Sequence, residues 1–181
     1  MRELSLHILD VLENALAAGA TSVELIIEED MAADLLTIIV RDNGRGMDEE
    51  QVSRAVDPFF TTRTTRHVGL GIPLFKAAAD RCNGRLTLSS KPGRGTELEA
   101  TFQHSHIDRA PLGDIEGTLV AFLLSGSCDL EYVHCVGDET FRFHTAEVQR
   151  ELGDVPLTHP AVVDWLRGFL AEGEAALASR R

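Results

Sequence analysis

The sequence Asp42-Asn43-Gly44-Arg45-Gly46-Met47 is the stretch around which this chain is organised. It follows a strand-like apolar run. That run, residues 35–40, reads Leu-Leu-Thr-Ile-Ile-Val. Two glycines spaced two apart let the backbone turn sharply and bring its N–H groups close to a ligand. Open α/β sheets place their ligands where strands end, which is where Asp42 stands. Taken alone, the stretch is also consistent with a simple polar turn.

Four further short motifs accompany this turn in a fixed order. They are Asp10-Val11-Leu12-Glu13-Asn14-Ala15-Leu16-Ala17-Ala18-Gly19-Ala20, Asp57-Pro58-Phe59-Phe60-Thr61-Thr62-Arg63, Gly69-Leu70-Gly71-Ile72 and Gly95-Thr96-Glu97. Together the five motifs resemble the GHKL ATPases: DNA gyrase B, the heat-shock-90 chaperones, the sensor histidine kinases and the MutL mismatch-repair proteins. The resemblance covers residues 4–103. Numbered in chain order, the first motif (residues 10–20) is most similar to MutL. The third (residues 57–63) and the fourth (residues 69–72) are most similar to histidine kinases.

The periodicity of apolar residues predicts a chain of mixed helices and strands. Helices are expected over residues 3–18, 72–82, 114–124, 145–152 and 160–179, with a short one from 48, and strands over 21–28, 35–41, 85–90, 96–102, 130–135 and 140–144. Thr145 is expected to cap the helix that starts there. The resemblance implies an α+β fold, the Bergerat-type two-layer sandwich, in which a mixed sheet carries helices on one face.

Two domains are expected within the 181 residues. Residues 1–104 would form the histidine-kinase-like ATP-binding domain. Residues 105–181 would form a small C-terminal α/β appendix, packed on the first domain, whose function the sequence does not indicate.

Composition excludes several classes of partner. The net charge of −12 argues against a nucleic-acid-binding surface, which needs clustered Lys and Arg. No apolar run is long enough to span a bilayer, and the N-terminus lacks the apolar core of a signal peptide. Three cysteines are a sparse, odd count for a secreted protein. We therefore expect a cytoplasmic protein that binds neither nucleic acid nor membrane.

The C-terminal half is rich in potential metal ligands: His104, His106, Cys128, His134, Cys135 and His144. None of these residues forms a pair with the tight CxxC spacing of a zinc site. His134 and Cys135 are neighbours in an expected strand, so their side chains would point to opposite faces. The pattern therefore does not predict a transition-metal site.

The first motif lies on the expected helix 3–18, where Asp10 and Asn14 are four residues apart and share one face. The resemblance implies that Asn14 holds Mg²⁺ through its amide oxygen and that Asp10 orients or deprotonates the attacking group. The family commonly has Glu at the Asp10 position, one methylene longer. Glu13 is the second candidate for the catalytic acid, although it points about a quarter-turn away. Alternatively, these polar groups form only the solvated side of the helix.

The resemblance assigns the second motif to adenine recognition. Asp42 would accept a hydrogen bond from the exocyclic amine of adenine, which guanine lacks at that position. Gly44 and Gly46 would let the base approach the backbone, and Met47 would cover it with apolar surface. In the family, the Thr at the position of Thr96 supports the adenine site through its hydroxyl, and the resemblance implies the same role here.

Residues 61–68 resemble the lid that closes over the triphosphate in this family. Thr62 and Arg63 offer groups suited to phosphate oxygens, although a plain surface loop is the competing interpretation. Gly69, Leu70 and Gly71 lead into the next expected helix, and backbone N–H groups at a helix start form an anion site. We expect Thr62, Arg63, Gly69 and Gly71 to hold the phosphates and Leu70 to belong to the same nucleotide-binding segment.

The expected function is Mg-ATP binding with ATPase or protein kinase activity toward a separate partner. A self-phosphorylating sensor kinase needs a phosphoacceptor His ahead of this core, whereas here the helix that carries the first motif begins almost at residue 1, and His7 lies within that helix. The alternative is a nucleotide-gated binding module, similar to the anti-sigma-factor regulators, with little or no catalysis. The partner and the oligomeric state, including a homodimer, stay open.

Overall fold

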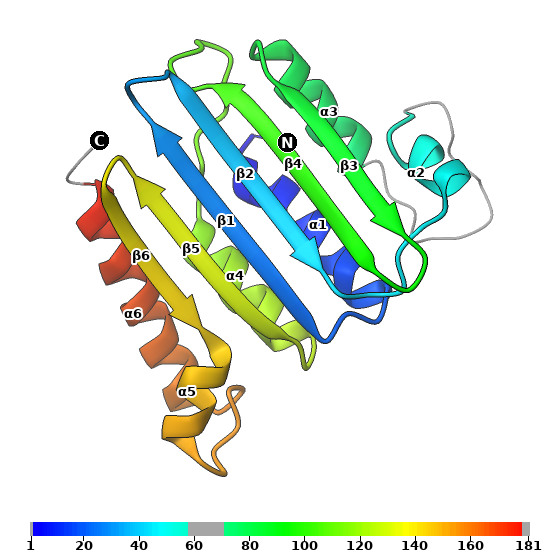
Figure 1. Cartoon of the computed structure of the whole chain (residues 1–181). Helices are drawn as coiled ribbons and strands as arrows, with labels where there is room; N and C mark the ends of the chain where they lie inside the picture. The colour runs from blue at the N-terminus through cyan, green and yellow to red at the C-terminus, as the bar shows by residue number, and fades with distance from the viewer. Residues whose placement is uncertain (1, 58–70, 179–181) are drawn as a thin grey trace.

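The computed structural model describes residues 2–57 and 71–178 of the chain. Within these residues, six strands form one sheet in the order β3-β4-β2-β1-β5-β6 (Figure 1). The strands are β1 (Ser22–Asp30), β2 (Leu35–Asp42), β3 (Arg85–Lys91), β4 (Gly95–Gln103), β5 (Asp129–Val136) and β6 (Glu139–His144). Neighbouring strands are antiparallel except β1 and β5, which run parallel, so the sheet is mixed.

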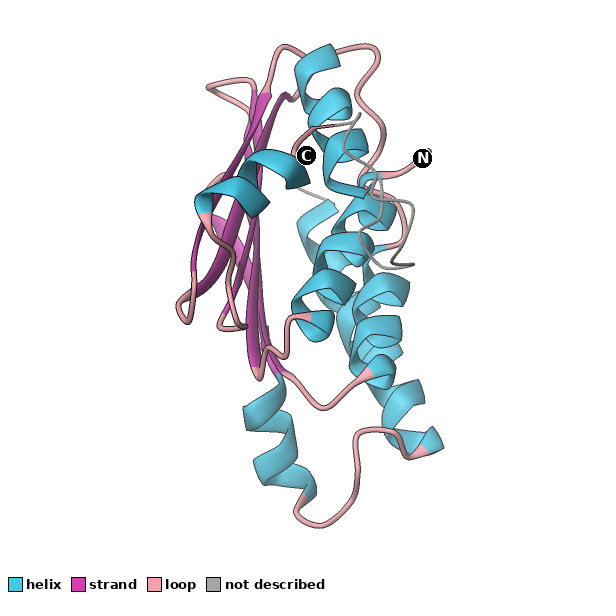
Figure 2. Ribbon diagram, turned by 90° about the vertical axis from the view of Figure 1, so that its right-hand side faces the viewer, coloured by secondary structure: helices cyan, strands magenta, loops and turns pink. Residues whose placement is uncertain are grey.

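The four longest helices of the described residues lie together on one face of the sheet (Figure 2). They are α1 (Leu4–Ala17), α3 (Gly71–Arg81), α4 (Ile115–Ser125) and α6 (Pro160–Ala178). Two shorter helices, α2 (Glu49–Ala55) and α5 (Thr145–Leu152), follow β2 and β6. The predicted α+β two-layer sandwich is thereby confirmed.

A single hydrophobic core lies between the sheet and the helices. Alternate residues of β1 point into it, namely Val23, Leu25 and Ile27, as the two-residue period of a strand dictates. From the other side, Leu4 and Ile8 of α1 are fully buried, one turn apart on the same helical face. Matching periods on the two surfaces therefore fix which face of each element is inside.

The C-terminal segment, residues 105–181, continues this sheet. Its strand β5 pairs with β1, with Asp129 opposite Ser22, and β6 forms the edge beyond it. Tyr132, Phe143 and Leu170 belong to the same core as the residues of α1. Residues on both sides of the expected boundary at 104 thus share one core, while their division into two functional units stays a prediction.

The start of α5 differs from the expectation for Thr145. The N-cap is His144, and Thr145 is a fully buried residue of the first turn. Its hydroxyl accepts a hydrogen bond from the backbone N–H of Leu130 at 2.9 Å. A hydroxyl that faces the neighbouring strand cannot cap its own helix, so tertiary packing overrides the local preference.

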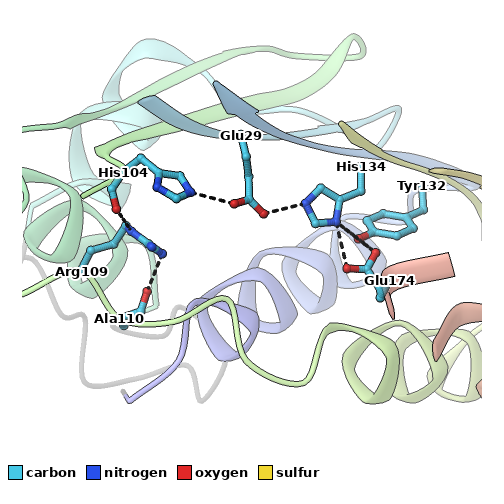
Figure 3. A network of polar contacts seen from close by, with 7 residues as sticks. All are labelled: Glu29, His104, Arg109, Ala110, Tyr132, His134 and Glu174. Carbon is cyan, nitrogen blue, oxygen red and sulfur yellow. Dashed lines mark hydrogen bonds and ion pairs between the residues drawn. The ribbon is translucent and has the colours of Figure 1, made fainter. Parts of the chain in front are cut away.

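A polar network crosses the core at the end of the sheet where β1 finishes (Figure 3). His134 lies between two carboxylates: its Nε2 is 3.0 Å from Glu29, and its Nδ1 is 2.9 Å from Glu174. The Tyr132 hydroxyl donates to Glu174 at 2.6 Å, and His104 contacts the second oxygen of Glu29 at 2.7 Å. The network joins β1, β5, α6 and the residue that follows β4.

These side chains do not form a metal cluster. Across residues 2–57 and 71–178, no three His, Cys, Asp or Glu side chains are placed to hold one metal ion. His134 faces the core, whereas the Cys135 thiol contacts Thr140 on the other face of the sheet.

Within residues 2–57 and 71–178, no helix combines the length and the apolar composition that a bilayer span requires.

Candidate functional site

A cavity of about 160 Å³ lies between α1, the start of α3, the end of β2 and the start of β4. Its walls are mostly apolar and carry a few polar groups, which is the usual make-up of a small-molecule site. The lining residues include Val11, Asn14, Val40, Asp42, Arg45, Gly46, Met47, Ile72, Leu88, Thr96 and Leu98. Five of the residues predicted from sequence are thus gathered around one cavity: Asn14, Asp42, Gly46, Met47 and Thr96.

Asp42 is the carboxylate of this cavity. It is half-buried at the end of β2, and its Oδ1 accepts a hydrogen bond from the backbone N–H of Gly44 at 2.7 Å. Burial raises the pKa of the Asp42 carboxyl, and donation from the backbone N–H groups of Gly44 and Thr96 opposes that rise. These backbone donors orient the carboxylate, and because each carboxylate oxygen has two lone pairs, acceptor capacity remains for a ligand.

Thr96 stands opposite Asp42 in the pairing of β2 with β4. Its hydroxyl oxygen lies 3.0 Å from that of Ser90 on β3. Ser90 also accepts a hydrogen bond from the backbone N–H of Met47 and donates one to the carbonyl of Gly95, each at 2.8 Å. The Ser90 hydroxyl therefore ties the turn after β2 to the turn between β3 and β4.

Glycine is required at two positions of these turns. Gly46 has φ +68°, and a Cβ there would lie 2.0 Å from the carbonyl oxygen of Lys91. Gly95 has φ +80°, and a Cβ there would lie 1.9 Å from the carbonyl oxygen of Asp42. Both turns thus combine a left-handed backbone with a close approach of two backbone segments. A residue with a side chain would displace one of these segments.

The turn is also bound to the neighbouring elements through Asn43. Its side-chain oxygen accepts from the backbone N–H groups of Thr21 and Ser22 at 2.8 and 3.0 Å. The backbone N–H of Arg45 donates to the carbonyl of Ala18, just after α1, at 2.9 Å. These contacts hold the turn against the start of β1 and the end of α1.

Asn14 reaches the cavity from the last turns of α1. It is partly buried, and its side-chain amide has no hydrogen-bond partner among the described residues. An amide oxygen free of protein partners is available to a cation or a ligand. Glu13, the neighbouring residue, is exposed and does not line the cavity.

Asp10 lies one turn earlier on α1, beside the start of α3. A Cβ added to Gly71, the first residue of α3, would lie 2.9 Å from Oδ2 of Asp10. Burial, and then the negative charge of Glu13, raise the pKa of the Asp10 carboxyl. The described part of α3 begins at Gly71, so the Asp10 carboxylate stands beside the start of this helix.

Several predicted contacts lie outside the described residues. These are Thr62, Arg63, Gly69 and Leu70. Gly71 is described and buried, and Ile72 after it lines the cavity. Gly44 is buried beside the cavity, where a Cβ would lie 2.9 Å from that of Ala18.

The sequence alone did not indicate the parts played by Ser90, Asn43 and Arg45. Ser90 binds Met47, Asn43 binds Thr21 and Ser22, and Arg45 binds Ala18, all through contacts between segments distant in the chain. The signal that could have found Ser90 is its position directly before the turn that leads to Thr96, because strands joined by a short turn pair there. Arg45 lines the cavity and is exposed at its surface.

His7 occupies the core next to α3. It is 3% exposed and stacks on Phe75, with ring centroids 4.9 Å apart. Burial, and then the positive chain terminus, lower the pKa of His7 to about 4. A neutral, buried ring of this kind packs against its neighbours.

Comparison with protein families gives one match. Residues 2–106 match the family described as histidine kinase-, DNA gyrase B-, and HSP90-like ATPase. The matched segment is more than half of the chain and contains every residue placed around the cavity above.

Curated relatives include proteins named as sensor kinases. Sensor protein kinase FleS of Pseudomonas aeruginosa is 42% identical over 109 residues, 60% of this chain and 26% of that protein. The Non-motile and phage-resistance protein of Caulobacter vibrioides is 32% identical over 111 residues, 56% of this chain and 13% of that protein. Sensor protein kinase WalK of Staphylococcus haemolyticus is 29% identical over 106 residues, 55% of this chain and 17% of that protein. The chain therefore spans about a quarter or less of these relatives.

One similar solved structure is the N terminal domain of a DNA repair protein. It has a TM-score of 0.53 and 11% identity, and the match covers 78% of this chain and 52% of that one. At this identity the likeness shows the fold alone.

Proposed function

This chain belongs to the family of histidine kinase-, DNA gyrase B- and HSP90-like ATPases, and from this we propose that it binds Mg-ATP and acts on a separate protein partner. ATP binding of the histidine-kinase-like type follows from the family and from the matched sensor kinases. Magnesium, the partner and the reaction are our proposals, as is the expected cytoplasmic location.

The observation that carries the proposal is the placement of Asp42. It presents a carboxylate inside a mostly apolar cavity, and the N–H of Gly44 orients it. A buried carboxylate costs free energy unless it finds donors. The exocyclic amine of adenine supplies such a donor, with Met47 and Leu98 as apolar walls and Thr96 beside it.

The phosphates would extend from this cavity toward α3. Asn14 would hold Mg²⁺ through its amide oxygen, and the ion would neutralise charge on the phosphates. The N–H groups at Gly71 would contact the phosphate oxygens, together with Thr62, Arg63, Gly69 and Leu70, which we assign from sequence.

Asp10 is the residue we assign to the reaction. It would accept the proton of the attacking oxygen, from water in an ATPase or from a side chain of the partner in a kinase. The raised pKa of its carboxyl brings it closer to neutral pH, which suits a general base. The exposed Glu13 is the second candidate.

A second function is favoured by the length of the Asp10 side chain. The family commonly has Glu at this position, and one missing methylene changes the reach of the carboxylate. A chain with poor reach would bind ATP and report it to a partner, as a nucleotide-gated binding module, with little or no catalysis.

Labelled ATP separates these functions. Release of γ-phosphate without an acceptor indicates an ATPase, transfer to lysate protein indicates a kinase, and neither, with ATP binding intact, indicates the gated module. Asp10→Asn is run beside the wild type so that contaminating activity is recognised. Absence of ATP binding in both proteins would contradict the proposal altogether.

A further inference from the structure

A second cavity, larger than the nucleotide cavity, lies between α5 and the first half of α6. Its volume is about 660 Å³, and it is lined by Val148 and Leu152 of α5 and by Trp165 of α6, with Glu147, Arg150 and Glu151 around them. In Figure 2 these two helices stand apart at the lower end of the molecule and are joined by the connecting loop. We call this cavity the α5–α6 groove.

Trp165 gives the groove a rigid aromatic wall. This side chain is 50% exposed and stacks on Phe169, with ring centroids 5.2 Å apart. Phe169 in turn contacts Phe141 and Phe143 of β6, at 5.6 and 6.2 Å between centroids. Trp165 is thus connected to the sheet through Phe169, and half-exposed tryptophans are frequent anchors of protein interfaces.

The rim of the groove is acidic. Glu147 and Glu151 are exposed, lie four residues apart on α5, and have no ion-pair partner among the described residues. Arg150 donates to the carbonyl of Ala146 in its own helix at 3.3 Å. Residues 145–165 contain four acidic side chains and one arginine. The groove is therefore complementary to a cationic partner.

We propose that the α5–α6 groove binds a basic amphipathic helix of a partner protein. The apolar face of that helix would pack on Val148, Leu152 and Trp165, and its Lys or Arg side chains would pair with Glu147 and Glu151. A helix laid in a groove between two helices is a common mode of recognition, and a cation over a tryptophan ring adds to it. A second copy of this chain fits poorly, because the same acidic rim on both copies would repel.

The groove lies at the same end of the sheet as the nucleotide cavity. Asp42 ends β2 opposite Val23, near the start of β1, and His144 ends β6 opposite Glu131, near the start of β5. The two strand ends are three strand spacings apart, about 14 Å. The two cavities therefore share one end of the sheet, and the proposal does not depend on nucleotide binding.

The chain has a built-in reporter for this proposal, because Trp165 is its single tryptophan. The probe is a 14-residue amphipathic helix of Leu and Lys without aromatic residues, and the control probe replaces each Lys with Glu. Binding of the Lys peptide in the groove should shift Trp165 emission to the blue and saturate. The Glu peptide should produce no shift.

Two matched double variants distinguish binding of the Lys peptide in the groove from non-specific attraction between a basic peptide and an acidic protein. Glu147→Gln with Glu151→Gln should weaken binding of the Lys peptide at least tenfold. Glu28→Gln with Glu131→Gln removes the same charge from exposed residues of the sheet and should leave it within twofold. Equal affinities for the two double variants would overturn the proposal.

Calorimetry on Trp165→Ala tests the aromatic wall without the fluorescent signal. Affinity for the Lys peptide should fall at least tenfold, while the circular dichroism spectrum stays that of the wild type. A dimer that sediments as such in the wild type and dissociates in Trp165→Ala would identify a second copy as the occupant and would also overturn the proposal.

Discussion

Asp10 and Gly71 lie in direct apposition: a methyl group on Gly71 would come within 2.9 Å of the Asp10 carboxylate. The contact joins α1 to the first residue of α3. Because the sequence assigns phosphate contacts to the start of α3, the carboxylate stands beside the expected position of the phosphates.

Asp10→Asn should abolish turnover while preserving nucleotide binding. Loss of a general base typically lowers a rate by about 10²–10⁴-fold. Removing a negative charge next to phosphates should leave ATP affinity equal or tighter. Single-turnover measurement of phosphate release or transfer checks the rate, and Glu13→Gln serves as the comparison. If Glu13→Gln alone abolishes turnover, the catalytic assignment moves to Glu13.

Asp42→Asn should weaken ATP binding, because the amide replaces one acceptor oxygen and carries no charge. Hydrogen bonds to charged groups contribute about 1.5–3 kcal/mol, which is roughly 10- to 150-fold in affinity. Titration with ATP and with GTP measures the loss and the change in preference. Equal ATP affinities in mutant and wild type would remove Asp42 from the adenine site.

Gly46→Ala should cost more stability than Gly93→Ala and should also weaken ATP binding, because Gly46 lines the nucleotide cavity. Both glycines have positive φ, +68° and +73°, so both variants carry a backbone strain of about 1–3 kcal/mol. Only at Gly46 does the new methyl group meet a neighbour, the carbonyl of Lys91. Urea unfolding and ATP binding of the two variants give the comparison. Equal behaviour would mean that the close approach is unimportant.

Stability should fall as pH rises above neutral, because His134 is charged between Glu29 and Glu174. Burial by itself lowers the pKa of His134, but its hydrogen bonds to Glu174 and Glu29 outweigh burial and raise the pKa above its ordinary 6.5. The stabilisation is therefore complete below pH 6.5 and is lost as pH rises through the raised value. Urea unfolding from pH 6 to 9 measures the effect.

The controls for this pH dependence are two histidine variants. His134→Gln should flatten the dependence, since the titrating group between the carboxylates is gone. His106→Gln, outside the network, should keep the wild-type slope. A wild-type stability that rises between pH 7 and 9 would contradict the charged state of His134.

The local elements of the fold were readable from sequence because each depends on near neighbours. Alternation of Val23, Leu25 and Ile27 predicts β1, and the helical spacing of Leu4 and Ile8 predicts α1. The parallel pairing of β5 with β1 was not predicted, since it depends on contacts between residues far apart in the chain. The burial of Thr145 against Leu130 was not predicted for the same reason.

The candidate site was readable to the extent that motifs carried it. The turn from Asp42 to Met47, Asn14 and Thr96 could be assigned to one site because their motifs together resemble one family. Ser90 and the pair of His134 with Glu29 carry no motif, and their roles arise only when the sheet brings them into contact. Contacts of that kind are set by register, which a single sequence does not reveal.

Calorimetric titration with a non-hydrolysable ATP analogue, with and without Mg²⁺, tests the central claim most directly. Wild type, Asn14→Ala and the exposed control Thr87→Ala would be compared. The account predicts magnesium-dependent binding that Asn14→Ala loses and Thr87→Ala keeps. Magnesium-dependent binding of equal affinity in Asn14→Ala, or no binding in the wild type, would contradict it.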